Sequence, residues 1–368
     1  MSSNTPVSSA DPINRQILSF AEDQITGFHA TPFASIAQRA GLDEQLVIQR
    51  LAAMLQAGTI RRIRQTLLST SLADGALIAW ELPDEQLEAA YAWLKDNDPF
   101  TGHVVLRRSE DPAAAGARYR LWTTLKVPTG YGSVVEHCKI LSKHIGALDF
   151  VPLPVVGMFA LSVGHVRRAG MQVGDKLPEP AKMQVPVIPT LSQREWDVLL
   201  SLKESLLTSE LTTRPWGARA AALGMSDEEF CRMAKALDEK KVIGRFASFL
   251  DHQGRGGHDA GTRASGLFHW TVPEGMEERA GAECGRHICM THCYWRSGGE
   301  KLGGAQIMGV VHAKSRELVL AHKRAIDEHL ASVGIPILHS AVFWSERAEV
   351  RPSEIRPDIY EAWLAAYA

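Results

Sequence analysis

The sequence lacks long apolar runs, an excess of either charge and a rich supply of cysteine. No stretch of about 18 apolar residues occurs, so no membrane-spanning helix is predicted. The formal net charge is −2 at pH 7, which excludes a strong general attraction to nucleic acid or membrane. Five cysteines, an odd number in a long chain, argue against a disulfide framework and favour the cytoplasm. Residues 1–12 are polar without an apolar core, so they predict a disordered leader and no secretory signal.

An internal repeat organises what is present. The chain has 368 residues, of which 45% are hydrophobic and 22% charged, a composition typical of two to four globular domains. Residues 31–63 align without a gap to residues 214–246, and the matches keep one constant offset. The matched pairs are Pro32 with Pro215, Gly41 with Gly224, Ile60 with Ile243, and Arg62 with Arg245.

Each copy of the repeat begins with the pattern of a winged helix-turn-helix. A short helix ends at a glycine, Gly41 or Gly224, where a left-handed residue commonly closes a helix. Asp43 and Ser226 follow as N-cap candidates for a second helix. A strand-like segment comes next, at residues 60–67 in the first copy, and forms the expected wing.

The second half of each copy alternates strand and helix patterns in the order βαββαβ, which is typical of a ferredoxin-like sandwich. In the first copy we expect these elements at 76–82, 84–96, 102–108, 119–127, 132–146 and 148–156. In the second copy we expect them at 267–273, 276–285, 288–296, 305–312, 317–334 and 336–344. The predicted fold is therefore α+β, a tandem repeat of winged helix-turn-helix and ferredoxin-like domains with pseudo-two-fold symmetry.

These patterns predict the boundaries of the domains. A segment rich in proline and polar residues separates the two copies and predicts a linker, and the last residues predict a docking helix. The predicted parts are a leader 1–12, a winged helix-turn-helix 13–68, a sandwich 74–160, a linker 174–190, a second winged helix-turn-helix 191–252, a second sandwich 264–346 and a tail 347–368.

A His-x-x-x-Arg element recurs on the second sandwich strand of each copy, as His103 to Arg107 and His292 to Arg296. Residues two apart on a strand share a face, so each His and its Arg point the same way. Arginine holds carboxylates bidentately and histidine transfers protons near neutral pH, so the pair suits a polyanionic ligand. We expect these faces to line cavities between the paired sandwiches.

The combination of these elements is similar to the Lrp/AsnC family of regulators, and the wing GTIRRIRQTL with the His-x-x-x-Arg strands resembles its siroheme decarboxylase branch in the fused, two-repeat form. The resemblance covers about residues 13–345. It implies decarboxylation of the acetate side chains of siroheme to didecarboxysiroheme, in haem or haem d1 biosynthesis. The substrate's own iron tetrapyrrole is then the electron sink, and no further cofactor is needed.

That resemblance assigns roles to particular residues. His103 and His292 are the candidate general acids, while Arg107 and Arg296 are candidates for holding substrate carboxylates. Tyr294 is placed to stack on the macrocycle or to donate a hydrogen bond. Arg120 is a further carboxylate candidate, and Arg62 and Arg245 are the least specific ones.

Two other functions compete with the enzyme: a DNA-binding regulator and a tetrapyrrole sensor without catalysis. The candidate recognition helix 44–57 carries only one acidic and one basic residue, and its counterpart 227–240 is acidic overall, which disfavours DNA. The basic wing residues Arg61, Arg62 and Arg64 favour it. The cluster Cys284, Cys289 and Cys293 fits no common metal site, so no metal is expected. Siroheme is thus the expected partner, without DNA or membrane, and the chain is expected to act alone or as a homodimer.

Overall fold

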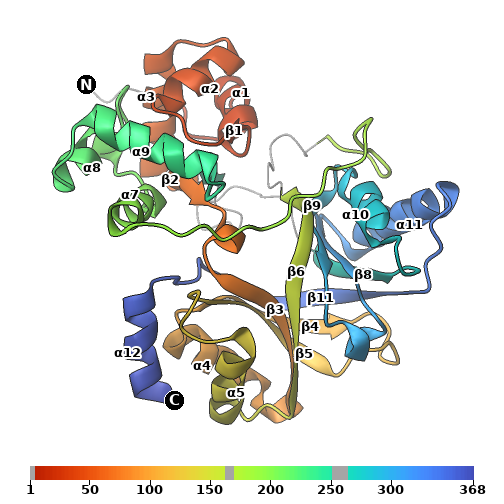
Figure 1. Cartoon of the computed structure of the whole chain (residues 1–368). Coiled ribbons are helices and arrows are strands. Elements are labelled where there is room, and N and C mark those ends of the chain that lie inside the picture. Colours follow the sequence, from red (N-terminus) through yellow and green to blue (C-terminus); the bar gives the residue numbers. More distant parts are fainter. Residues whose placement is uncertain (1–4, 162–169, 251–263) are drawn as a thin grey trace. The chain divides into compact units, whose positions relative to one another are not determined.

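The computed structural model describes residues 5–161, 170–250 and 264–368, and its chain divides into two compact units (Figure 1). The helical unit comprises residues 1–68, 163–170 and 189–261, and the barrel unit comprises residues 69–162, 171–188 and 262–368. Each unit therefore collects segments from both copies of the predicted repeat. In the part of the chain that the structure describes, no helix combines the length and the apolar character needed to cross a bilayer.

The helical unit contains two similar sets of helices, each followed by a strand. The first set is α1 (Pro12–Ala21), β1 (Ile25–Thr26), α2 (Pro32–Ala40), α3 (Glu44–Gln56) and β2 (Ile60–Leu67). The second is α7 (Gln193–Lys203), α8 (Gly217–Ala222), α9 (Asp227–Glu239) and β7 (Ile243–Leu250). Gly41 and Gly224 both adopt a φ of 64°, and the side chains of Asp43 and Ser226 cap the helices that follow. The predicted glycine turns and N-caps are confirmed.

The two predicted wings pair with each other. β2 and β7 are antiparallel neighbours, with Ile63 opposite Ser248, and β1 pairs with the other edge of β7. A buried aromatic contact between Phe33 and Phe246, with ring centroids 5.5 Å apart, packs α2 of the first set against the wing of the second. The strands that a DNA-binding protein would present to a groove are thus used to join the two halves.

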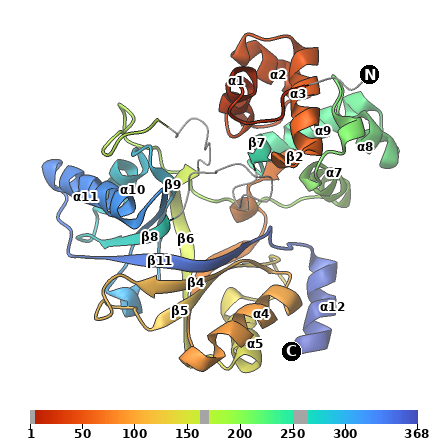
Figure 2. The ribbon, with the colours of Figure 1, turned by 180° about the vertical axis from the view of Figure 1, so that it is seen from behind.

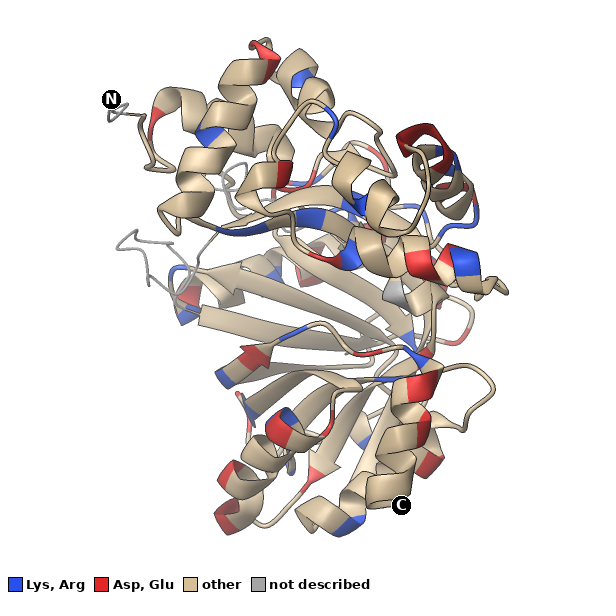
Figure 3. Cartoon of the chain, turned by 90° about the vertical axis from the view of Figure 1, so that its left-hand side faces the viewer, with Lys and Arg blue, Asp and Glu red and all other residues tan. Residues whose placement is uncertain are grey.

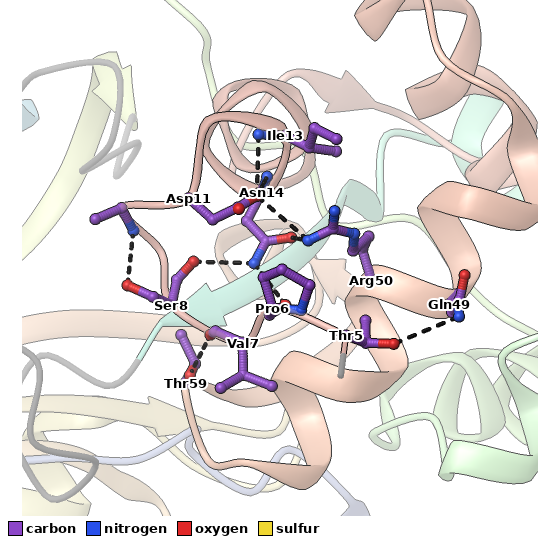
Figure 4. Close-up of polar contacts among 11 residues, drawn as sticks. Thr5, Pro6, Val7, Ser8, Asp11, Ile13, Asn14, Gln49, Arg50 and Thr59 are labelled. Carbon is purple, nitrogen blue, oxygen red and sulfur yellow. Dashed lines mark hydrogen bonds and ion pairs between the residues drawn. The ribbon is translucent and has the colours of Figure 1, made fainter. Parts of the chain in front are cut away.

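The N-terminal segment lies against the first set of helices and differs from the predicted disordered leader (Figure 4). The buried Asn14 side chain donates to the carbonyl oxygens of Pro6 and Ser8, each at 2.9 Å. Asp11 caps α1 by accepting from the backbone N–H of Ile13 and Asn14. A buried amide orders this segment because it must satisfy its donors on the chain itself. Residues 1–4 of the predicted leader lie outside the described residues.

The barrel unit carries the two βαββαβ runs. The first consists of β3 (Asp74–Glu81), α4 (Leu87–Asn97), β4 (Thr101–Ser109), β5 (Tyr119–Val127), α5 (Val134–Ile145) and β6 (Asp149–Leu161). The second consists of β8 (Ala264–Thr271), α10 (Glu277–Gly285), β9 (Met290–Arg296), β10 (Ile307–Ala313), α11 (Arg316–Ser332) and β11 (His339–Val350). Every strand and helix expected in these runs is present, with ends shifted by a few residues.

All eight strands close into one barrel, in the order β10-β8-β11-β4-β5-β3-β6-β9. Each run forms a four-stranded sheet, and the sheets join along β4 with β11 and β6 with β9. The helices lie outside, α4 and α5 on the first sheet and α10 and α11 on the second (Figure 2). Two separate sheets would each leave two open edges, and closure satisfies the backbone hydrogen bonds of those edges.

The barrel unit has three apolar clusters. One lies between the first sheet and its helices and includes Trp80, Leu94 and Leu141, and another lies in the same place on the second sheet. The third fills part of the barrel interior with Val105, Trp122 and other residues of both sheets. Residues of a barrel strand alternate between the outer layers and the interior, so these clusters show which residues point inward.

Two further segments pack onto the barrel unit. The C-terminal helix α12 (Pro357–Tyr367) buries Tyr360 and Trp363 in the cluster beneath α4 and α5, which confirms the predicted docking helix. Residues 171–188 include most of the predicted linker and belong to the barrel unit. They are held there by backbone hydrogen bonds from Leu177 to Arg286 and from Ala181 to Ala282.

Candidate functional site

The two His-x-x-x-Arg strands, β4 and β9, stand four places apart in both directions around the barrel, so they face each other across it. On β4, Val105 belongs to the interior cluster, and His103 and Arg107 share its face. On β9, Cys293 contacts the carbonyl oxygen of Gly281 in α10, outside the barrel. His292, Tyr294 and Arg296 alternate with Cys293 and face inward.

His103 is partly buried near the beginning of β4. Its backbone N–H donates to the Oγ1 of Thr124 at 2.9 Å, which anchors β4 to β5. Burial, assisted by the positive charge of Arg107, lowers the pKa of His103 to about 4. The imidazole is therefore neutral near pH 7 in the unliganded chain, and it needs a nearby negative charge before it can hold a proton.

Arg107 and Arg296 occupy equivalent positions in the two halves, and both are buried. Each is only 7% exposed, and burial lowers the pKa of each guanidinium to about 10, so both stay charged at neutral pH. Arg107 donates from Nη1 to the Oγ of Ser345, and Arg296 from Nη1 to the carbonyl oxygen of Leu153, both at 2.8 Å. The Nε of each has no hydrogen-bond partner among the described residues.

Aromatic contacts arrange the β9 side of the interior. The guanidinium carbon of Arg296 lies 4.7 Å from the ring centroid of Tyr294, a cation–π distance. The rings of Tyr294 and His292 are stacked, with centroids 6.2 Å apart and planes 20° apart. His292, Tyr294 and Arg296 therefore form a continuous row, which confirms that they share a face.

Lys126 is a buried cation that the sequence analysis missed. It is the penultimate residue of β5, and burial together with the charge of Arg296 lowers its pKa to about 8, against the opposing effect of Asp74. Alternation from Trp122, an interior residue, places Lys126 on the inward face of β5 and would have identified it. Buried charges need compensation, so Arg107, Arg296 and Lys126 together favour an anionic ligand.

The remaining predicted carboxylate ligands are placed elsewhere. Arg120 donates to the carbonyl oxygen of Arg107 at 2.8 Å, and its terminal nitrogens lie 3.2 Å from the carboxylates of Asp84 and Glu346. Its guanidinium is thus already paired. Arg62 and Arg245 lie on β2 and β7 of the helical unit, where Arg62 contacts the ring of Phe249.

Three cations of the predicted DNA-reading elements contact other groups of the chain. Arg50, the only basic residue of α3, is nearly buried and contacts Asp11 and Asn14 with its Nη1 (Figure 4). In the wing, Arg61 donates to the carbonyl oxygen of Leu250, and Arg64 to that of Lys203. On the helices of both units acidic and basic residues are interspersed (Figure 3). Non-specific DNA binding needs exposed cations facing phosphate, and burial takes Arg50, the one cation of α3, out of that role.

The clustered cysteines Cys284, Cys289 and Cys293 are buried. All five are thiols in the described part of the chain, and Cys284 and Cys293 are buried with the pKa of each thiol raised by burial. Among the described residues no group of three or more His, Cys, Asp or Glu side chains is placed to hold a metal ion. Buried, protonated thiols act as small apolar groups.

Comparison with known proteins gives consistent matches. Residues 28–61 match the family described as siroheme decarboxylase NirDL-like HTH domain. A siroheme decarboxylase of Hydrogenobacter thermophilus is 25% identical over 313 residues, which cover 84% of this chain and 86% of that protein. The siroheme decarboxylase alpha subunit of Desulfovibrio desulfuricans is 30% identical over 129 residues, 34% of this chain and 68% of the subunit.

A solved structure shares the fold. The crystal structure of the siroheme decarboxylase NirDL in co-complex with an iron-uroporphyrin III analogue superposes with a TM-score of 0.67. The sequence identity is 21%, and the match covers 97% of this chain and 100% of that one. The mixed α+β fold with a helix-turn-helix is therefore that of NirDL.

Proposed function

The chain belongs to the siroheme decarboxylases, and we propose that it removes carboxyl groups from the acetate side chains of siroheme to give didecarboxysiroheme, in haem or haem d1 biosynthesis. The observation that supports this most is the pair of buried guanidinium groups, Arg107 and Arg296, each with an Nε that has no partner among the described residues. A buried, unpaired donor is costly, and a carboxylate would satisfy it.

The reaction consumes a proton for each carbon dioxide released. The bond between the acetate methylene and its carboxylate carbon breaks, carbon dioxide leaves, and the methylene becomes a methyl group. A macrocycle that is protonated on a pyrrole carbon accepts the electron pair of the broken bond, so the chemistry calls for a general acid and no dissociable cofactor. The substrate's own ring is the electron sink.

We assign the acid role to His103 and His292 and the carboxylate-binding role to Arg107 and Arg296. A substrate carboxylate beside His103 would offset the charge of Arg107 and raise the pKa of the imidazole from its value of about 4. The acid would thus be charged only when substrate is bound. Tyr294, stacked between His292 and Arg296, would pack against the macrocycle.

Three other arginines have less support as ligands of a substrate carboxylate. Arg120 is assigned to holding β4, Asp84 and Glu346 together, because each of its three nitrogens already has a partner. A carboxylate role for Arg62 and Arg245 stays a prediction.

We also propose that the chain is a tandem duplication of a winged helix-turn-helix and a ferredoxin-like βαββαβ domain, related by a pseudo-two-fold axis. The order of elements and the sheet orders β4-β5-β3-β6 and β9-β10-β8-β11 support it. The domain limits would be those expected from the sequence: 13–68, 74–160, 191–252 and 264–346. One chain would then supply both halves of a barrel, so a homodimer would not be needed to complete it. Five reduced cysteines support a place in the cytoplasm.

Anaerobic incubation of the purified protein with siroheme, followed by mass analysis of the tetrapyrrole, tests the function. Decarboxylated product that is lost in His103→Ala or His292→Ala is the expected result. Tight binding without a change of mass would instead indicate a sensor. Absence of both, with DNA affinity that falls steeply as salt rises, would indicate a regulator.

A further inference from the structure

We propose that Lys126 is a substrate-binding residue whose ammonium holds a carboxylate of the tetrapyrrole together with Arg296. This inference rests on the proposed function and extends it to a residue outside the His-x-x-x-Arg elements. It is carried by the position of Lys126 in the barrel, the space that the fold leaves for its side chain, and the charges that face it.

The position of Lys126 is set by β5. Leu125 and Val127 on either side of it belong to the cluster under α4 and α5, so Lys126 points the other way, into the barrel. Its side chain is 9% exposed. Its ammonium makes no hydrogen bond among the described residues, so this charge is buried without a hydrogen-bond acceptor.

Gly75 makes room for this side chain. It lies directly opposite Lys126 in the β3–β5 pairing, and a Cβ at Gly75 would come within 2.6 Å of the Lys126 Cδ. The lysine stem therefore lies over the glycine backbone. The equivalent place in the second half holds His312 on β10 opposite Ser265 on β8, so both halves carry a titratable side chain here.

The charges that face Lys126 make it an anion-binding group. Arg296 on β9 disfavours the ammonium, and Asp74 on β3 favours it. Two buried cations that repel each other both gain when a carboxylate binds between them. A uroporphyrin-type ring has carboxylates on every pyrrole, so it offers separate carboxylates to this pair and to Arg107.

The test compares Lys126→Met, which keeps the length of the side chain without its charge, with Lys126→Arg, which keeps the charge. Lys301→Met is the matched control, because Lys301 forms an exposed ion pair with Asp149. Each protein is titrated with iron uroporphyrin III and with protohaem, whose carboxylates are fewer, and binding is followed by the Soret band. Thermal unfolding is measured in parallel.

We expect Lys126→Met to weaken iron uroporphyrin binding by about 10- to 100-fold, the usual effect of losing a charge-assisted hydrogen bond. Lys126→Arg and Lys301→Met should bind iron uroporphyrin within about threefold of the wild-type affinity. The affinity of Lys126→Met for protohaem should change by less than the loss of one carboxylate contact would cause. The melting temperature of Lys126→Met should not fall, since a buried like-charge contact is removed.

The pH dependence separates a binding role from a packing role. Wild-type affinity for iron uroporphyrin should decrease as pH rises from 7 to 9, because the ammonium loses its proton, and Lys126→Arg should lack this decrease. If Lys126→Met binds iron uroporphyrin as tightly as the wild type does, this inference is overturned and the proposed function is not. If the wild type binds neither tetrapyrrole and does not turn over siroheme, the proposed function is overturned and this inference with it.

Discussion

The guanidinium of Arg296 and the ring of Tyr294 are in cation–π contact at 4.7 Å, on a strand that faces the equivalent Arg107 across the barrel. The Nε of Arg296 has no hydrogen-bond partner among the described residues, although the side chain is buried. The barrel thus holds a buried donor that an anion would satisfy, and Arg107 on the opposite strand provides a second one.

Replacing either arginine should reduce activity without loss of folding. We expect Arg107→Met or Arg296→Met to lower kcat/KM for siroheme by about 10- to 100-fold, because a charge-assisted contact to carboxylate is lost. Arg108→Met is the control, since the neighbouring Arg108 is exposed and pairs with Glu346. Steady-state kinetics with thermal unfolding checks this, and equal activity in all variants would contradict the assigned site.

His269 should lower the free energy of unfolding and make it depend on pH. It is fully buried, neither ring nitrogen has a partner among the described residues, and burial lowers its pKa to about 3. The unfolded chain therefore binds a proton below about pH 6.5 that the folded chain refuses until about pH 3. The free energy of unfolding should fall as pH is lowered through this range. His269→Leu should add roughly 1–3 kcal/mol at pH 7 and reduce the slope in urea unfolding. A steeper slope in the variant would refute this account.

The contact between His137 and Tyr360 should hold the C-terminal helix. The Nδ1 of His137 is 3.1 Å from the hydroxyl of Tyr360 and its Nε2 is 3.3 Å from Asp98, inside the apolar cluster. We expect Tyr360→Phe to cost about 1 kcal/mol and His137→Ala about 2–4 kcal/mol, because the latter also leaves Asp98 buried without its partner. Denaturant unfolding measures both. Siroheme turnover by Tyr360→Phe should be unchanged.

Arg50 should stabilise the helical unit and should not contribute to DNA binding. Its Nη1 contacts Asp11 and Asn14 in a nearly buried position, so Arg50→Met should destabilise the helical unit by roughly 1–3 kcal/mol. Fluorescence anisotropy with a labelled duplex should give the same weak affinity for wild type and variant. A wild-type affinity that depends strongly on salt and is lost in Arg50→Met would reverse this assignment.

Local patterns predicted most elements because their causes are local. Gly41 and Gly224 end their helices with the same left-handed φ, and the caps at Asp43 and Ser226 lie where the sequence placed them. β5 spans the predicted residues 119–127, since its alternation of apolar residues is fixed by the pleat. The leader was predicted to be disordered, but residues 6 and 8 contact Asn14. Composition does not show these contacts, because they depend on the buried side chain of Asn14.

By itself, the sequence predicted the repeat, and it determined the alternation that puts each His and Arg on one face and the low charge of α3. Tertiary structure alone decided what those faces meet, because closing the barrel depends on pairing β4 with β11 and β6 with β9, strands that lie in different halves of the chain. It also decided the protonation of His103 and Lys126, whose pKa values follow from burial and from neighbours such as Arg107 and Arg296. The sequence shows which residue types are present and where they lie along the chain. The desolvation and the facing charges that shift their pKa values exist only once the barrel is closed.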